Sequence, residues 1–167
     1  TMVIRNLITI RGIVKEYAAD SVARLERSLG IEHGLVNLGG DFSLIGSQPG
    51  NKPWAVGISS PVSESGIMAK IDLIDGGLAS SGDYERFFMH EGHRYSHILN
   101  PMTGWPSNGL RAVSIAANLC SVAGSVATIA MLKDELEAKA WLKDSGLAYV
   151  YMDSKEEISS AGLSAEN

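Results

Sequence analysis

Two short stretches of this sequence combine glycine with groups that could bind a phosphate. The first, Gly39-Gly40-Asp41, follows an apolar segment, and glycines without a Cβ atom allow a backbone to approach a ligand phosphate closely. An ordinary turn at the end of a strand accounts for the same residues. The second, 80–84, places two hydroxyl groups before a glycine and an acid, so it could donate hydrogen bonds to a phosphate or cap a turn. Neither stretch identifies a site by itself.

A histidine beside a rigid loop is the third group that could take part in a reaction. His97 precedes a segment in which Pro101, Gly104 and Pro106 restrict the backbone. A fixed loop next to an imidazole suits a group that must accept or hold a proton at a defined place. A solvated surface histidine is the alternative.

A zinc site built from the nearby histidines is not expected. In one extended segment, His90 would point away from the side occupied by His93 and His97, so the three rings would not converge. We expect His90 and His93 to be solvated.

Composition narrows the function classes. The chain has 167 residues and a formal net charge of −5, and its Lys and Arg residues are scattered singly, so it lacks the basic stripe of a nucleic-acid-binding protein.

Cys120 is the only cysteine, which excludes an internal disulfide and a thiolate metal cluster, and we expect it to be a buried small hydrophobic residue. No apolar run is long enough to cross a bilayer, and residues 2–13 do not read as a signal peptide, although removal of a leader would leave the same sequence. These features do not assign the chain to a cellular compartment.

Hydrophobic periodicity predicts the elements that would position these groups. Helices are expected at 18–29, 121–132 and 134–145. Strands are expected at 35–45, 54–59, 67–74, 87–99, 111–117 and 147–152, with 87–99 and 111–117 forming a pair. Clustered strands followed by helices favour an α+β layered domain with a largely antiparallel sheet and flanking helices. We predict one domain over residues 1–153 and a polar, frayed tail over 154–167.

Five blocks in the same order resemble the FAD:protein FMN transferases, also called the thiamine-biosynthesis lipoprotein family. The blocks are 12–20 (GIVKEYAAD), 37–41 (NLGGD), 53–58 (PWAVGI), 80–84 (SSGDY) and 97–106 (HILNPMTGWP). Members of this family move FMN from FAD onto a Ser or Thr of a target flavoprotein. The resemblance spans residues 12 to about 151 and corresponds to the carboxyl-terminal half of a typical member. The fold it implies is therefore one half of that family's layered, T-fold-like domain.

The resemblance assigns roles to residues of these blocks. His97 would be the base or the group that orients the target hydroxyl, and Lys15 would contact the flavin. The residues implied in binding the flavin nucleotide are Lys15, Tyr17, Asp20, Gly39, Gly40, Asp41, Ser81, Gly82, Asp83 and Ile98. FAD would be the substrate and Mg²⁺ the metal, with a target flavoprotein as partner and no nucleic acid. The family also implies a bacterial periplasmic or membrane-anchored location.

The implied metal site departs from the family pattern. The resemblance implies that the main-chain carbonyl of Val14 and the hydroxyl of Thr128 bind the metal, together with an Asp for which this chain has Gly124. Mg²⁺ normally recruits carboxylate oxygens, so replacing Gly124 with Asp is expected to raise magnesium affinity. Glycine weakens a helix by roughly 1 kcal/mol relative to alanine, so packing gives no evident reason for its presence. Glu16 stands where the family has glycine, which is a second departure.

Two functions therefore remain open. In the first, the chain transfers FMN, and another acid, such as Asp20, Asp41 or Asp83, compensates for Gly124. In the second, the chain is a catalytically degenerate domain that binds flavin or a protein partner without transfer, which Gly124, Glu16 and the half-length resemblance favour. A second copy could also complete the sheet in a homodimer, because an unpaired sheet edge favours pairing.

Overall fold

The computed structural model describes residues 13–60, 62, 66–84 and 87–162, with the backbone alone for His93 and Arg94. Within these residues the helices are α1 (Val14–Ser28), α2 (Cys120–Leu132) and α3 (Glu135–Ser145). The strands are β1 (Gly34–Leu38), β2 (Asp41–Gly46), β3 (Trp54–Ser59), β4 (Ile67–Leu73), β5 (Gly77–Gly82), β6 (Phe87–His90), β7 (His93–Ser96), β8 (Ala112–Ala117), β9 (Ala148–Met152) and β10 (Ile158–Ala161). The predicted α+β class is confirmed. The outer parts of the predicted domain and tail, residues 1–12 and 163–167, lie outside the described residues.

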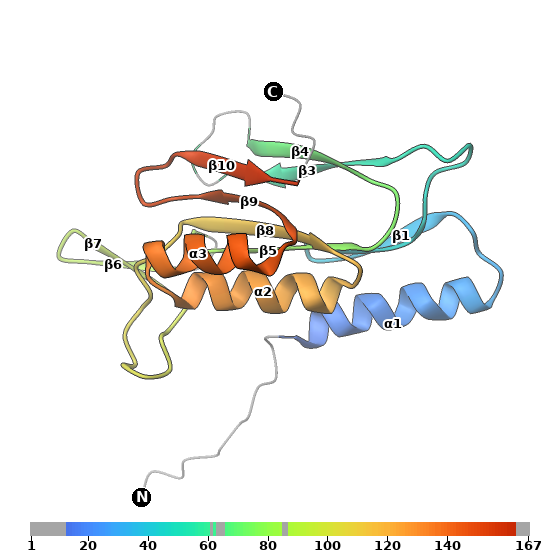
Figure 1. The fold of residues 1–167 in the computed structure, drawn as a ribbon. Helices are drawn as coiled ribbons and strands as arrows, with labels where there is room; N and C mark the ends of the chain where they lie inside the picture. The colour runs from blue at the N-terminus through green and yellow to red at the C-terminus, as the bar shows by residue number, and fades with distance from the viewer. Residues whose placement is uncertain (1–12, 61, 63–65, 85–86, 163–167) are drawn as a thin grey trace, which may run out of the picture.

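Six strands form one antiparallel sheet in the order β1-β2-β5-β8-β9-β10. The helices cover one face of this sheet and the β3–β4 hairpin covers the other, which gives three layers (Figure 1). Because side chains alternate between the two faces of a strand, β1, β5, β8 and β9 each contribute residues to both cores. Val113 and Ile115 of β8 pack with the helices, whereas Leu44 of β2 and Leu78 of β5 pack beneath the hairpin.

Strand β5 occupies the middle of the sheet, where the sequence predicted a loop over 80–84. Its small residues have weak strand propensity, which is why the strand was missed. Gly77 is required because β5 passes close to the start of α2: a Cβ added there would lie 2.5 Å from the Cys120 nitrogen and 2.8 Å from the Phe42 oxygen. Ser81 and Gly82 therefore belong to a strand rather than to a loop, which corrects the prediction.

Several other boundaries also differ from the prediction. The predicted strand 35–45 is two strands, since Gly39 and Gly40 turn the chain with φ values of +63° and +91°. Segment 87–99 contains the separate hairpin β6–β7, and β8 pairs with β5 and β9 instead. Residues 158–161, expected to be frayed, form β10 against β9. Helix α1 begins at Val14 rather than at residue 18.

None of the described helices is long and apolar enough to cross a membrane. The six-stranded sheet ends in β1 on one side and β10 on the other. Pairing of such an edge with a second copy stays a prediction, which a measurement of molecular mass in solution would test.

Candidate functional site

Polar side chains gather where α1 lies across the start of β2 and the start of α2. These residues, which we call the α1 junction, are Lys15, Glu16, Asp20, Asp41 and Ser43. The alternation of β2 explains the arrangement, because Phe42 and Leu44 point into the core beneath the hairpin while Asp41 and Ser43 point to the other face, toward α1. Four of the five junction residues carry charge, and α1 supplies three of the five.

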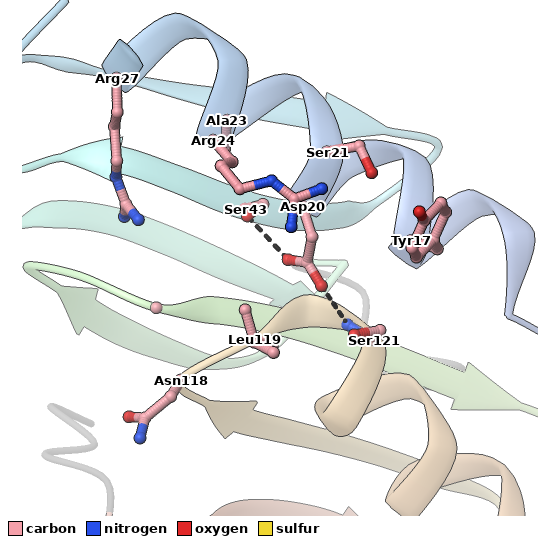
Figure 2. Close-up of a pocket in the computed structure, with 11 residues that line it drawn as sticks. Tyr17, Asp20, Ser21, Ala23, Arg24, Arg27, Ser43, Asn118, Leu119 and Ser121 are labelled. Atoms are coloured by element: carbon pink, nitrogen blue, oxygen red, sulfur yellow. Dashed lines mark hydrogen bonds between the residues drawn. The ribbon is translucent and has the colours of Figure 1, made fainter.

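Asp20 uses both carboxylate oxygens to cap α2 from a different helix. Its Oδ1 accepts hydrogen bonds from the Cys120 N–H and the Ser43 hydroxyl, and its Oδ2 accepts one from the Ser121 N–H, each at 2.9 Å. Figure 2 shows the bonds to Ser43 and Ser121. The α2 N-cap residue, Leu119, makes no side-chain cap, so Asp20 satisfies N–H groups that the helix start leaves open. Burial alone would raise the pKa of Asp20, but these hydrogen bonds outweigh it and the pKa is lowered. Asp20 thus has a structural role, and its contact with flavin stays a prediction.

Lys15 and Asp41 form an ion pair beside the Gly39–Gly40 turn. Lys15 Nζ lies 2.7 Å from Asp41 Oδ2 and donates a longer hydrogen bond, 3.4 Å, to the Gly39 carbonyl oxygen. Asp41 is buried and its Oδ1 accepts the Ser80 N–H at 3.2 Å, whereas the Lys15 side chain is 44% exposed. The structure therefore brings three of the predicted flavin-binding residues together, with the positive group facing solvent.

Glu16 is the neighbour of Lys15 on α1 but turns inward. It is 9% exposed, and its Oε2 is buried without a hydrogen-bond donor in the described part of the chain. Burial is the main cause that raises the pKa of Glu16, and the negative charge of Asp41 raises it further. A buried carboxylate that lacks donors is costly unless a proton or a cation compensates.

Gly124 on α2 provides the space that Glu16 occupies. A Cβ added at Gly124 would lie 2.7 Å from Glu16 Cγ and 3.0 Å from Glu16 Oε1. Because cores are close-packed, any side chain at this position would require Glu16 to move. Packing therefore explains the glycine, which corrects the sequence interpretation. An aspartate at position 124 would displace Glu16 rather than simply add a ligand.

The two residues implied in metal binding lie close in sequence to this contact. Thr128 is half-buried one helical turn after Gly124, so both residues lie on the same side of α2. Val14 begins α1, two residues before Glu16. Carboxylate, hydroxyl and carbonyl oxygens are hard donors, so these groups fit Mg²⁺. Within the residues described, no three His, Cys, Asp or Glu side chains form a metal-binding group, so a bound cation would need oxygens of other kinds as well.

The predicted residues at the end of β5 have structural partners. A side chain at Gly82 would overlap the ring of Tyr84, which packs across the glycine. Asp83 Oδ2 lies 3.3 Å from Nε of Arg111, and its N–H donates to the carbonyl oxygen of the same residue. Ser81 is half-buried in β5 and pairs with Val113 of β8. The sheet and an ion pair thus position these residues, and their contact with flavin stays a prediction.

His97 follows β7 and is exposed. The next loop is closed by Asn100, whose Oδ1 accepts the Met102 N–H at 2.8 Å and whose N–H donates to the Trp105 carbonyl oxygen at 2.8 Å. Ile98 is half-buried and packs against the core beneath the helices. The neighbouring β6–β7 hairpin projects beyond the layers at the end opposite the last turn of α1 (Figure 1). None of the contacts that define the α1 junction involves His97.

The register of the β6–β7 hairpin also corrects the prediction that the histidines lie along one extended segment. His90 is paired directly with His93, because Glu91 and Gly92 turn the chain with φ values of +48° and +77°. The two residues therefore do not follow one another along a single extended strand. His90 is exposed, as expected.

A pocket lies alongside the α1 junction, on the outer side of Asp20. Tyr17, which was predicted to bind flavin, lines it together with Arg24 and Asn118 (Figure 2). Arg27 at its far end is already engaged, since its guanidinium donates to the main-chain oxygens of Leu44 and Ile45 at 2.6 Å.

The sequence reasoning missed Glu16 and Ser43 as members of the site. A signal for Glu16 was present, since the resemblance implies a glycine where this chain has Glu16 and an acid where it has Gly124. The two departures are complementary in size and charge. Ser43 carried no such signal, because a serine in a strand is ordinary.

Comparison with known proteins identifies the family of this chain. The model of the ApbE family matches residues 5–151. FAD:protein FMN transferases of Escherichia coli and Vibrio cholerae are each 35% identical, over 142 residues (84% of this chain, 40% of the relative) and over 130 residues (77% and 39%). The chain thus spans about 40% of the length of these curated relatives.

Solved structures give the same result. The ApbE protein of Thermotoga maritima has a TM-score of 0.81 and 32% identity, covering 90% of this chain and 50% of that chain. The flavin transferase ApbE from Vibrio cholerae has a TM-score of 0.74 and 29% identity, covering 93% of this chain and 49% of that chain. The family model, the relatives and the shared fold together show that this chain belongs to the ApbE family.

Proposed function

We propose that this chain forms part of an FAD:protein FMN transferase, which takes FMN from FAD and attaches it to a Ser or Thr of a target flavoprotein. The relatives carry this activity in their names, and the chain spans only part of their length. The observation that carries the proposal is the Lys15–Asp41 ion pair at the Gly39–Gly40 turn. It joins the first two family blocks in space and presents an ammonium group to solvent.

In the proposed reaction, the oxygen of the target hydroxyl forms a bond to the phosphorus of the FMN half of FAD. The bond from that phosphorus to the bridging oxygen breaks, AMP leaves with the bridging oxygen, and the hydroxyl proton passes to a base. Positioning and charge neutralisation supply most of the acceleration in transfers of this kind. His97 is the proposed base or orienting group, and its exposed position on a closed loop leaves it accessible to a target hydroxyl.

Lys15 is proposed to hold the flavin nucleotide. Asp41 restrains its ammonium group from the buried side, while 44% of the Lys15 side chain stays exposed. A restrained ammonium group loses less conformational freedom when it binds an anionic or carbonyl oxygen of the ligand. The adjacent glycine turn lets the ligand approach the backbone closely.

Mg²⁺ is the proposed metal, held in part by the Val14 carbonyl oxygen and the Thr128 hydroxyl. When bound, it would neutralise negative charge on the diphosphate. The hard oxygen donors described above support this choice over a thiolate-seeking metal.

The test is incubation of the purified chain with FAD, MgCl₂ and a flavoprotein domain that carries a target Ser or Thr. Chromatography measures released AMP, and mass spectrometry measures FMN covalently attached to the target. We expect both products to appear together and to fall at least roughly tenfold in Lys15→Met. Lys155→Met, which changes an exposed lysine between β9 and β10, is the matched control and should leave both unchanged. FAD binding without AMP would favour the non-transferring alternative, and absence of both binding and AMP would contradict the proposal.

A further inference from the structure

We propose that Glu16 supplies, from α1, the carboxylate ligand to the divalent cation that the family pattern places at position 124 on α2. This inference rests on the proposed function, because the cation is the one that would accompany the FAD diphosphate. It assigns a role to a residue that lies outside the family's own pattern of ligands.

The contact with Gly124 carries the first step. The Glu16 carboxyl carbon lies 3.1 Å, and its Oε1 3.0 Å, from the place where a Cβ at position 124 would be. An aspartate at 124 would hold its carboxyl carbon one bond from that Cβ. The two carboxylates therefore compete for one small volume, and the chain fills it from α1 instead of α2.

The burial of Glu16 carries the second step. The residue is 9% exposed, and Oε2 faces no hydrogen-bond donor among the residues described. Asp20, one turn further along α1, accepts three hydrogen bonds, so the fold supplies donors to a carboxylate with a structural role. A buried carboxyl group without donors must either hold a proton or meet a cation, and a bound divalent cation would displace the proton.

The local charge carries the third step. Glu16 and Asp41 are two buried acids, and Lys15 is the cation that pairs with Asp41 at 2.7 Å. The single positive charge of Lys15 cannot neutralise both carboxylates, so the three groups keep a net negative charge whenever both acids are ionised. A divalent cation on Glu16, shared with the diphosphate, would offset that charge.

The chemistry of the neighbouring groups selects the cation. Thr128, four residues after Gly124, and Val14, two residues before Glu16, offer a hydroxyl and a main-chain carbonyl oxygen. With the Glu16 carboxylate these are hard oxygen donors, which favour Mg²⁺ or Mn²⁺. Because the described residues form no cluster of three acidic, histidine or cysteine ligands, phosphate and water oxygens would fill the remaining positions.

The test measures binding of Mn²⁺ to the full chain by loss of the free-ion signal in electron paramagnetic resonance, with and without FAD. In Glu16→Gln, which keeps the shape of the side chain, we expect the Mn²⁺ dissociation constant to rise roughly tenfold or more. Glu26→Gln, on the same helix and away from Gly124, is the matched control and should keep the wild-type value. Equal Mn²⁺ affinity in wild type and Glu16→Gln, or no binding by wild type in either condition, overturns the assignment.

A paired exchange sharpens the result. Gly124→Asp alone should not improve Mn²⁺ binding, because the new side chain collides with Glu16. Glu16→Gly combined with Gly124→Asp should recover at least part of the affinity lost in Glu16→Gln. Thermal unfolding followed by circular dichroism checks that each variant folds, and Mn²⁺ should raise the midpoint of wild type but not of Glu16→Gln. AMP release with no effect of Glu16→Gln on Mn²⁺ binding would keep the proposed function and reject this assignment.

Discussion

Two successive turns of α1 place a carboxylate against α2 in different environments, one half-buried and one buried. Asp20 accepts hydrogen bonds from Cys120, Ser121 and Ser43, and its pKa is lowered despite burial. Glu16, one turn earlier, is buried against Gly124 with an oxygen that no described donor reaches, and burial raises its pKa. The difference shows that burial alone does not give an acid its role. An acid whose oxygens are satisfied holds helices together, whereas an acid left unsatisfied remains available to a ligand.

The largest change in stability should come from removing Asp20, the acid whose oxygens accept hydrogen bonds. Asp20→Ala deletes the acceptor of three hydrogen bonds and leaves two N–H groups at the start of α2 without a partner, so we expect the free energy of unfolding to fall by about 3 kcal/mol. Urea unfolding measures the change. Asp144→Ala, at an exposed position on α3, is the control and should change stability by less than about 0.5 kcal/mol. An Asp20→Ala variant that matched this control would remove the capping role.

A smaller loss of stability should appear when Asp20 is protonated at low pH. The pKa of Asp20 is lowered in the folded chain from a reference of 3.8, so its stabilisation is present above that reference pH and is lost as the pH falls through the lower folded value. Urea unfolding at several values between pH 5 and pH 2 should therefore show a steeper loss of stability for wild type than for Asp20→Asn. Parallel curves for the two proteins would mean that Asp20 is not the acid that stabilises the α2 start.

The packing of Glu16 against Gly124 predicts that a larger residue at position 124 destabilises the fold. Gly124→Ala should lower the free energy of unfolding by roughly 1–2 kcal/mol, because the new methyl group meets Glu16, even though alanine favours a helix by roughly 1 kcal/mol. In a Glu16→Ala background, the same substitution should be neutral or stabilising. A double-mutant cycle by urea unfolding measures this coupling. Additive changes would show that the two residues do not share the space.

The smallest expected effect concerns the reactivity of Cys120 rather than stability. Cys120 is fully buried, as the sequence predicted, and burial together with the charges of Asp41, Asp20 and Glu16 raises the pKa of its thiol to about 12. Thiolate is therefore scarce at neutral pH. Iodoacetamide at pH 8 should label Cys120 only after unfolding in urea, as followed by mass spectrometry. Labelling of the folded chain at the unfolded rate would contradict this burial.

Local patterns predicted the helices better than the centre of the sheet. For α3, the sequence carries both end signals, and the structure uses them: Asp134 accepts the Glu137 N–H at 2.9 Å, and Gly146 ends the helix with φ +65°. The central strand β5 carries no such signal, because its small residues have weak strand propensity, and Gly77 and Gly82 stand where a Cβ would meet Cys120 and the Tyr84 ring. Which residues of β5 are buried depends on the elements that pack against the strand in the folded chain.

By itself, the sequence determined the α+β class, the amphipathic helices and the order of the family blocks, since these follow from local periodicity, capping residues and short motifs. Only the tertiary structure decided which acids are satisfied. Asp20 meets Cys120 across 100 residues of chain, and Glu16 meets Gly124 over a similar separation. Such contacts depend on how closely α1 packs against α2, and that distance is set by small residues on both helices, among them Ala19, Ala123 and Ala127, whose importance is visible only once they are in contact.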